Sequence, residues 1–196
     1  NRDITPVDGA EIEYWSDIKP ILDNRCVVCH SCYDAPCQLK LTAPEGLDRG
    51  AIRKSPYDVR INPDKPSRLF QDRDTVNDWR KFGFHPVLNE HTQSEVANRN
   101  ASSMYQLLEQ KERMPLVLNN QKLSEEYTLK ISRKQSCPKI HELEKHINEN
   151  PSWGMPYALP GLPNQEQVQL KKWIEGGATY ASSASRHTGF SDQINT

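Results

Sequence analysis

The sequence predicts a mainly α fold in which long loops separate the helices. Apolar residues recur at spacings of three and four in several segments, strand-like alternation is nearly absent, and fourteen prolines and nine glycines divide the helical segments. At 196 residues the chain is long enough for one domain with a real core, and we expect residues 1–180 to form it. Residues 181–196 are small and polar and are expected to form a tail or linker.

The first expected helix delivers a cluster of cysteines. Ser16 or Asp17 can cap it, and it runs directly into Cys26 with three aliphatic residues on one side, namely Ile18, Ile21 and Leu22. Residues 39–66 then read as a loop, because prolines and glycines punctuate them: Pro44, Gly46, Gly50, Pro56, Pro63 and Pro66.

Two further helices are expected in the middle of the chain. A short one follows Asp74 and carries Val76, Trp79 and Arg80. Another begins at Ser103, which forms a capping box with Gln106, and its apolar positions are Met104, Leu107 and Leu108.

Two more helices are expected near the carboxyl end. One opens at Cys137-Pro138, and its apolar residues recur at spacings of three and four as Ile140, Leu143 and Ile147. The last has Asn164 as N-cap and ends at Gly176-Gly177, and its apolar residues are Leu170, Trp173 and Ile174.

The stretch "RCVVCHSCYDAPC" contains the motif with the clearest chemistry. Cys26, Cys29 and His30 spell C-x-x-C-H, the attachment pattern of a c-type haem. Two thiols three residues apart on one helical turn can reach the two vinyl groups on one edge of a porphyrin, and the adjacent imidazole then lies under the iron. A zinc site is disfavoured because the cysteines lie too close together for two ligand pairs, and a thioredoxin-like redox pair lacks its βαβ context.

A covalent haem also explains how so polar a chain can fold. Hydrophobic residues make up only 35% of the sequence, and a core with so few of them usually needs a covalent cross-link or a cofactor for stability. We therefore predict a cytochrome c-like helical domain with Pro-rich loops wrapped around one haem. The residues expected to line it, or to belong to an ordinary core, are Trp15, Ile18, Leu22, Val27, Leu39, Leu41 and Trp173.

His30 fills one axial position of the iron, and the sixth ligand needs a thioether or imidazole donor. Met155 in "WGMPYALPGLP" is favoured, because the loop precedes the last helix and its prolines can hold the side chain in place. Met114 and His85 are the alternatives. Met104 lies on the apolar stripe of its helix and is expected in the core.

The other cysteines and histidines have less definite expected roles. Either Cys32 pairs with Cys37 or one of these two pairs with Cys137, which would leave one thiol free in an oxidising compartment. The remaining histidines are expected on the surface, and they are His91, His141, His146 and His187.

Charge and hydropathy exclude two classes of partner contact. A net charge of -1 gives no basic face for nucleic acid, and no apolar run approaches the roughly 20 residues that a membrane-spanning helix needs. Any membrane contact is expected to be peripheral. The chain starts at Asn1 without an initiator methionine or an apolar leader, as expected if a signal peptide has been removed or the chain has been trimmed. With a c-type haem motif, the expected location is the bacterial periplasm, after export and removal of a signal peptide.

Several longer stretches resemble the amino-terminal region of the bacterial fatty acid cis/trans isomerases, from about Tyr14 to Ala178. These stretches are "YWSDIKPILDNRCVVCHSCYDAPCQLKL", "EGLDRGA", "SRLFQD", "WRKFGFHPVLNE", "SSMYQLLEQK", "GMPYALPGLPNQE" and "LKKWIEGGA".

Members of that family are periplasmic haem c enzymes that convert cis-unsaturated acyl chains of phospholipids to trans, and they are longer than this chain. The resemblance implies haem attachment at Cys26 and Cys29, with His30 and Met155 as iron ligands. It also draws attention to five residues whose roles it leaves open, namely Cys32, Cys37, His85, Asn89 and Glu90.

The predicted function is therefore that of the haem-bearing part of such an isomerase, acting on unsaturated fatty acids or phospholipid acyl chains. Ferric haem would withdraw electron density from the double bond transiently, allow rotation, and return it. The alternative is a monohaem c-type cytochrome that transfers electrons in the periplasm.

Overall fold

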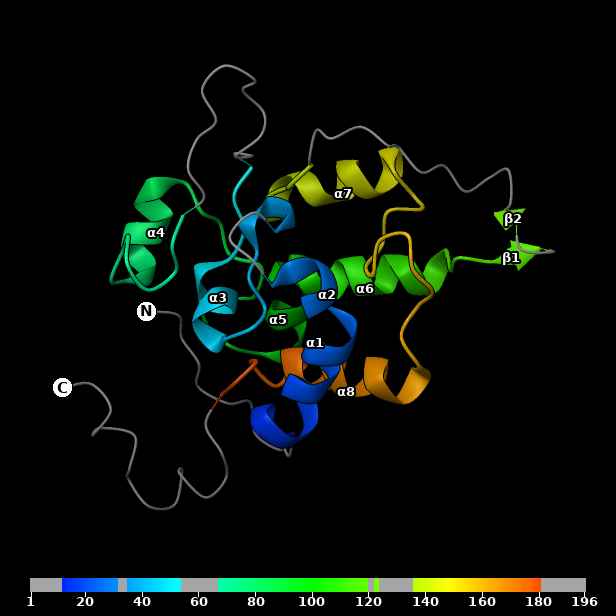
Figure 1. The fold of residues 1–196 in the computed structure, drawn as a ribbon, viewed down its shortest axis with the longest axis horizontal. Helices are drawn as coiled ribbons and strands as arrows, with labels where there is room; N and C mark the ends of the chain where they lie inside the picture. Colours follow the sequence, from blue (N-terminus) through cyan, green and yellow to red (C-terminus); the bar gives the residue numbers. More distant parts are fainter. Residues whose placement is uncertain (1–11, 32–34, 54–66, 120–121, 124–135, 181–196) are drawn as a thin grey trace.

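Helices form nearly all of the regular structure in the part of the chain that the structure describes (Figure 1). The structure is a computed structural model, and it describes residues 12–31, 35–53, 67–119, 122–123 and 136–180. The mainly α prediction is confirmed for these residues. The expected tail at 181–196 lies outside them, so the boundary at residue 180 stays a prediction.

The first helical segment has three consecutive parts. A single π-helical turn, Tyr14–Ile18, continues into α1 (Lys19–Arg25) and then α2 (Val27–His30). Tyr14, Ile18 and Leu22 are buried at a spacing of four, which places them on one face. The segment begins earlier than predicted, and the Asp17 carboxylate accepts a hydrogen bond from the amide of Glu13 at 2.8 Å.

The region predicted as a loop after residue 39 contains a helix that the sequence analysis missed. A 3₁₀ turn, Pro36–Gln38, is followed by α3 (Pro44–Arg49). The prediction was wrong because Pro44 and Gly50 were interpreted only as helix breakers. Pro44 stands in the first helical turn, where its missing amide hydrogen costs nothing, and Gly50 ends the helix with φ 77°.

The middle of the chain forms three helices. α4 (Val76–Phe82) is the short helix expected after Asp74, and Thr75 caps it. α5 (Glu95–Ala101) was not predicted, although Ser94 is a typical N-cap and accepts a hydrogen bond from Ala97 N.

α6 (Ser103–Arg113) is the expected central helix, but its cap differs from the prediction. Ser102 caps it in place of Ser103, and Gln106 donates to the carbonyl of Asn100. The helix leads toward two short antiparallel strands, β1 (Leu118–Asn119) and β2 (Lys122–Leu123).

The carboxyl-terminal part contains α7 (Ile140–Glu149) and α8 (Asn164–Glu175), both of which were predicted. Asn164 is the first helical residue of α8 and Pro163 is its N-cap, so the predicted cap was wrong by one position. α6 runs through the centre of the molecule and contacts α5, α7 and α8, while α8 also contacts the turn Tyr14–Ile18 (Figure 1).

One main core joins the two ends of the chain. Tyr14, Trp173 and Tyr180 pack ring against ring, with centroids 5.6 Å apart for Tyr14–Trp173 and 5.0 Å for Tyr14–Tyr180. Met104 is half-buried and packs against this core, close to its expected role. A second, smaller cluster consists of Ile52, Trp79 and Phe84.

Two surface expectations for histidines are confirmed and one is wrong. His91 and His141 are exposed, and His187 lies outside the described residues. His146 is buried and pairs through Nδ1 with the Ser136 hydroxyl at 3.1 Å. His146 lies one helical turn after the buried Leu143 on α7 and packs against the Trp153 ring, with centroids 5.8 Å apart, which explains its burial.

A disulfide joins Cys37 to Cys137 across 100 residues of sequence. This is one of the pairings that the sequence left open, and Cys32 lies outside the described residues. None of the described helices is both long and apolar enough to cross a membrane.

The disulfide generates a stability prediction. The double substitution Cys37→Ser/Cys137→Ser should lower the free energy of unfolding by about 2–5 kcal/mol, because the unfolded chain regains the freedom of a long closed loop. Urea unfolding followed by circular dichroism measures this difference. Wild-type protein treated with a reducing agent should approach the variant, and equal unfolding midpoints for oxidised wild type and variant would contradict the prediction.

Candidate functional site

Cys26, Cys29 and His30 lie on one helical turn where α1 meets α2. The amides of Cys29 and His30 both donate to the carbonyl of Cys26, at 3.1 and 3.0 Å. Both thiols are free; Cys26 is half-buried and Cys29 is exposed. Burial raises the pKa of the Cys26 thiol to about 11. The motif therefore presents two unpaired thiols and an imidazole on one helical turn.

A backbone carbonyl orients the His30 ring. His30 Nδ1 lies 3.0 Å from the carbonyl oxygen of Leu39. Because a carbonyl can only accept, Nδ1 carries the hydrogen and Nε2 has the free lone pair. Burial also lowers the pKa of His30, which favours the neutral ring. A neutral imidazole with a free Nε2 is the form that binds a metal ion.

These donors fit a covalently attached haem. Two free thiols at the required spacing can form the two thioether bonds, and His30 Nε2 can bind the iron from the same turn. Elsewhere in the described ranges, as at this motif, no group of three or more His, Cys, Asp or Glu side chains is placed to hold a metal ion by itself. A haem iron takes four ligands from the porphyrin and needs only the axial ones from the chain.

The residues expected to line a haem, or to belong to an ordinary core, divide into three groups. The main core contains Ile18, Leu22, Leu41 and Trp173, and Val27 and Leu39 are half-buried against it. Trp15 differs, since 57% of its surface is exposed. It faces outward because the π-helical turn directs Tyr14 and Ile18 into the core instead. The ordinary-core interpretation of Trp15 is therefore wrong.

The loop that carries Met155 is fixed to α6 at its start. Met155 N donates to the carbonyl of Leu107 at 2.9 Å, and Lys111 Nζ donates to the carbonyl of Leu159 at 3.2 Å. Gln110 Nε2 reaches the carbonyl of Asn150 at 2.6 Å. Gly154 lies so close to α6 that a Cβ on it would come within 2.3 Å of the Lys111 amide nitrogen.

The far end of the same loop is tied to the cysteine motif. The loop leads into α8, and Glu166 in the first turn of α8 accepts two hydrogen bonds from Arg25, at 2.7 and 2.8 Å. Arg25 directly precedes Cys26. Met155, which is half-buried, therefore stands in a segment anchored between α6 and the motif.

The two alternative ligands lie in other surroundings. Met114 follows the last turn of α6, and its amide donates to the carbonyl of Gln110 at 3.0 Å. His85 is buried and pairs with Ala51 through two backbone hydrogen bonds. Burial lowers the pKa of His85 to about 4, and its Nδ1 has no hydrogen-bond partner among the described residues. Ile52, the residue after Ala51, donates its amide hydrogen to the carbonyl of Cys37. The backbone of His85 is therefore linked through Ala51 and Ile52 to the disulfide residue Cys37.

Asn89 and Glu90 have structural contacts. Asn89 is buried and donates to Asn98 Oδ1 at 2.8 Å. Glu90 accepts from Arg80 Nε at 3.0 Å, and Arg80 also donates to backbone carbonyls at the end of α3. Both residues connect the segment after α4 to its neighbours.

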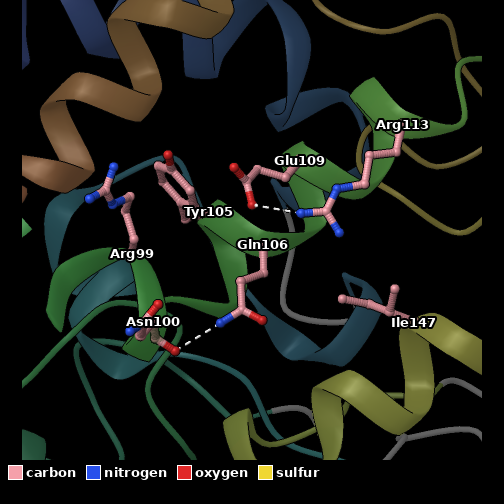
Figure 2. Close-up of a pocket in the computed structure, with 7 residues that line it drawn as sticks. All are labelled: Arg99, Asn100, Tyr105, Gln106, Glu109, Arg113 and Ile147. Atoms are coloured by element: carbon pink, nitrogen blue, oxygen red, sulfur yellow. Dashed lines mark hydrogen bonds and ion pairs between the residues drawn. The ribbon is translucent and has the colours of Figure 1, made fainter. Parts of the chain in front are cut away.

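A cavity of about 400 Å³ lies beside α6 (Figure 2), and no residue of the cysteine motif lines it. Figure 2 shows Tyr105, Gln106, Glu109 and Arg113 along α6, with residues of α5 on one side and Ile147 of α7 on the other. Its walls are mostly polar and pair with one another, since Arg113 lies 3.4 Å from Glu109 and Gln106 donates to the carbonyl of Asn100 at 2.8 Å. Such walls do not suit an acyl chain.

Comparison with known protein families identifies the chain. The family model described as "Fatty acid cis/trans isomerase (CTI)" matches residues 64–196, which is more than half of the sequence. The chain belongs to the fatty acid cis/trans isomerase family. Among curated proteins and among solved structures, the same comparison found no match.

The match confirms the predicted family but not the whole extent of the resemblance. It begins at residue 64, whereas the cysteine motif lies at residues 26–30. The family to which this chain belongs is described by an isomerase activity on unsaturated fatty acids, and the match gives no support to the electron-transfer alternative.

The sequence analysis missed the backbone groups of the site. The carbonyl of Leu39 and the close contact of Gly154 with α6 carry no side-chain signal, so no pattern of residue types points to them. The Arg25–Glu166 pair is separated by 141 positions, and only the folded chain brings it together.

The contact of Gly154 with α6 generates a second prediction. Gly154→Ala should lower the free energy of unfolding by about 1–3 kcal/mol, because the new methyl group meets the backbone of α6 and the Met155 loop must move. Thermal unfolding measures the loss, and hydrogen exchange at the Met155 amide should accelerate.

Gly161→Ala is the matched control in the same loop. A Cβ there would lie 3.6 Å from Lys111 Cγ, which is an ordinary contact, so we expect a change within about 0.5 kcal/mol. Equal effects of the two substitutions would contradict the prediction.

Proposed function

We propose that this protein is the haem c-bearing part of an isomerase that converts cis-unsaturated phospholipid acyl chains to trans. The observation that carries the proposal is the family match over residues 64–196, in a chain whose amino-terminal segment holds the C-x-x-C-H motif. The Arg25–Glu166 pair and the Cys37–Cys137 disulfide fasten that segment to the matched part.

Four residues would hold the cofactor. Cys26 and Cys29 would form the thioether bonds, His30 would bind the iron through Nε2, and Met155 would be the sixth ligand. The anchoring of the Met155 loop to α6 and, through α8, to Arg25 supports Met155 over Met114 and His85. When bound, ferric haem would supply a one-electron acceptor toward the double bond, so no nicotinamide or ATP is needed.

The protein's own residues would set the properties of the site. The Leu39 carbonyl keeps the hydrogen of His30 on Nδ1 and so keeps Nε2 available. The Met155 thioether would keep other donors away from the sixth position.

The location proposed for the protein is the bacterial periplasm. The Cys37–Cys137 disulfide supports an oxidising compartment, as does covalent haem attachment. Contact with the membrane that supplies the acyl chains is proposed to be peripheral.

The central test replaces the haem-binding residues in the full-length protein. Cys26→Ala/Cys29→Ala should abolish covalent haem, seen as an intact mass equal to the bare polypeptide. His30→Ala should reduce formation of trans acyl chains from cis-monounsaturated phospholipid to the level without protein, as measured by gas chromatography, because the iron loses its protein ligand.

His91→Ala is the control, since His91 is exposed and its side chain takes no part in the site. Trans product formed by protein without haem would refute the mechanism. A haem-loaded wild type that makes no trans product but exchanges electrons rapidly would favour the electron-transfer alternative.

The sixth ligand can be tested separately. Met155→Ala should lower the haem midpoint potential and change the low-spin absorption spectrum, because an axial thioether favours the ferrous state. Met114→Ala should leave both unchanged. If Met114→Ala or His85→Gln produced these changes instead, Met155 would not be the ligand.

A further inference from the structure

We propose that Arg49 is a positioning residue for His30, acting through the backbone of Gln38 and Leu39. Arg49 lies at the end of α3, and its guanidinium donates to the carbonyls of Gln38 and Ser67. The inference rests on the proposed function, in which His30 binds the haem iron. It adds a residue that controls how strongly this ligand donates to the metal.

The two residues directly before Leu39 have an unusual backbone conformation. Cys37 and Gln38 have φ angles of 57° and 49°, in the left-handed region that residues with a Cβ rarely adopt. Two successive residues of this kind persist only when their surroundings hold them. The carbonyl that orients His30 belongs to the next residue, Leu39, so its direction depends on these two residues.

Arg49 supplies a principal part of that hold. Its Nη2 donates to the carbonyl of Gln38, and its Nη1 donates to the carbonyl of Ser67 at 3.1 Å. Ser67 N in turn donates to the side-chain oxygen of Gln38 at 3.0 Å. The backbone of Gln38 is therefore bound by Arg49, and its side chain is bound by Ser67, which Arg49 also contacts. The neighbouring Cys37 carbonyl accepts from Ile52 N at 2.9 Å.

The guanidinium of Arg49 is held rigidly in turn. The side chain is fully buried, and its Cζ lies 4.8 Å from the centroid of the Phe84 ring and 5.4 Å from that of Trp79. A planar cation packed against a pair of aromatic rings, with its donors on carbonyl oxygens, has little freedom to turn. A lysine would keep the charge but lose the planar fork.

The position of the Leu39 carbonyl matters for the iron. A hydrogen bond from Nδ1–H to an acceptor makes the other ring nitrogen a stronger donor. A stronger donor stabilises ferric relative to ferrous iron. Loss of Arg49 should loosen Gln38 and Leu39, weaken the hydrogen bond, and raise the midpoint potential.

The test measures the midpoint potential of the haem-loaded, full-length protein with Arg49→Met and Arg49→Lys. We expect Arg49→Met to raise the ferrous-to-ferric ratio at a fixed potential up to about tenfold, which is about 59 mV for one electron. Arg49→Lys should give a smaller rise in the same direction. In the ferrous protein, NMR should show faster hydrogen exchange at His30 Nδ1.

Arg80→Met is the matched control. Arg80 also donates to backbone carbonyls in this region, those of Asp48 and Arg49, and pairs with Glu90, but it does not touch Gln38. It should lower stability without moving the midpoint potential or the exchange rate at His30. An equal shift in Arg80→Met and Arg49→Met would reduce Arg49 to a general stabilising role and overturn the proposal.

The remaining outcomes are also decisive. Folded Arg49 variants that hold haem with wild-type midpoint potential and exchange rate would overturn the inference and leave the proposed function intact. If both Arg49 variants failed to hold haem while Arg80→Met held it, the positioning role would be rejected in favour of a folding role. A wild-type protein without covalent haem would instead refute the proposed function.

Discussion

The hydrogen bond between His30 Nδ1 and the carbonyl of Leu39 links two segments nine residues apart and fixes which ring nitrogen is free. Backbone contacts on both sides keep these two groups in place. The helical turn of the motif fixes His30 from one side, and the carbonyl of His30 accepts a hydrogen bond from Leu41 N at 2.9 Å. The left-handed residues Cys37 and Gln38 fix Leu39 from the other.

The two parts of the chain, the motif segment and the family-matched region, share one core. Tyr14 packs on Trp173, Ala51 pairs with His85, and Tyr180 donates to Asp48 Oδ1 at 3.0 Å. Each of these contacts joins a residue before position 64 to one after it. The motif is therefore built into the same packed unit as the region that identifies the family, and it is not a separate appended module.

The sequence predicted the helices whose apolar spacing is regular, including the first one, which leads into the cysteine motif as expected. It failed where the deciding interaction is made by the backbone or by distant residues. α3 was not predicted because Pro and Gly break a helix in its interior, whereas Pro44 begins this helix and Gly50 ends it. Trp15 and His146 were misplaced because their burial depends on the helix neighbours, and residue type alone does not reveal these. Arg49 gave no sequence signal, since its importance comes from the Gln38 carbonyl.

Under the proposed function, the four described cysteines have two different chemical fates, which would impose an order on biogenesis. Cys37 and Cys137 form a disulfide, whereas Cys26 and Cys29 would have to stay reduced until a porphyrin reaches them. In the proposed periplasmic location, all four thiols would meet the same oxidants. A premature bond between a motif cysteine and Cys37 or Cys137 would then trap a product that can neither take up pigment nor form the native cross-link.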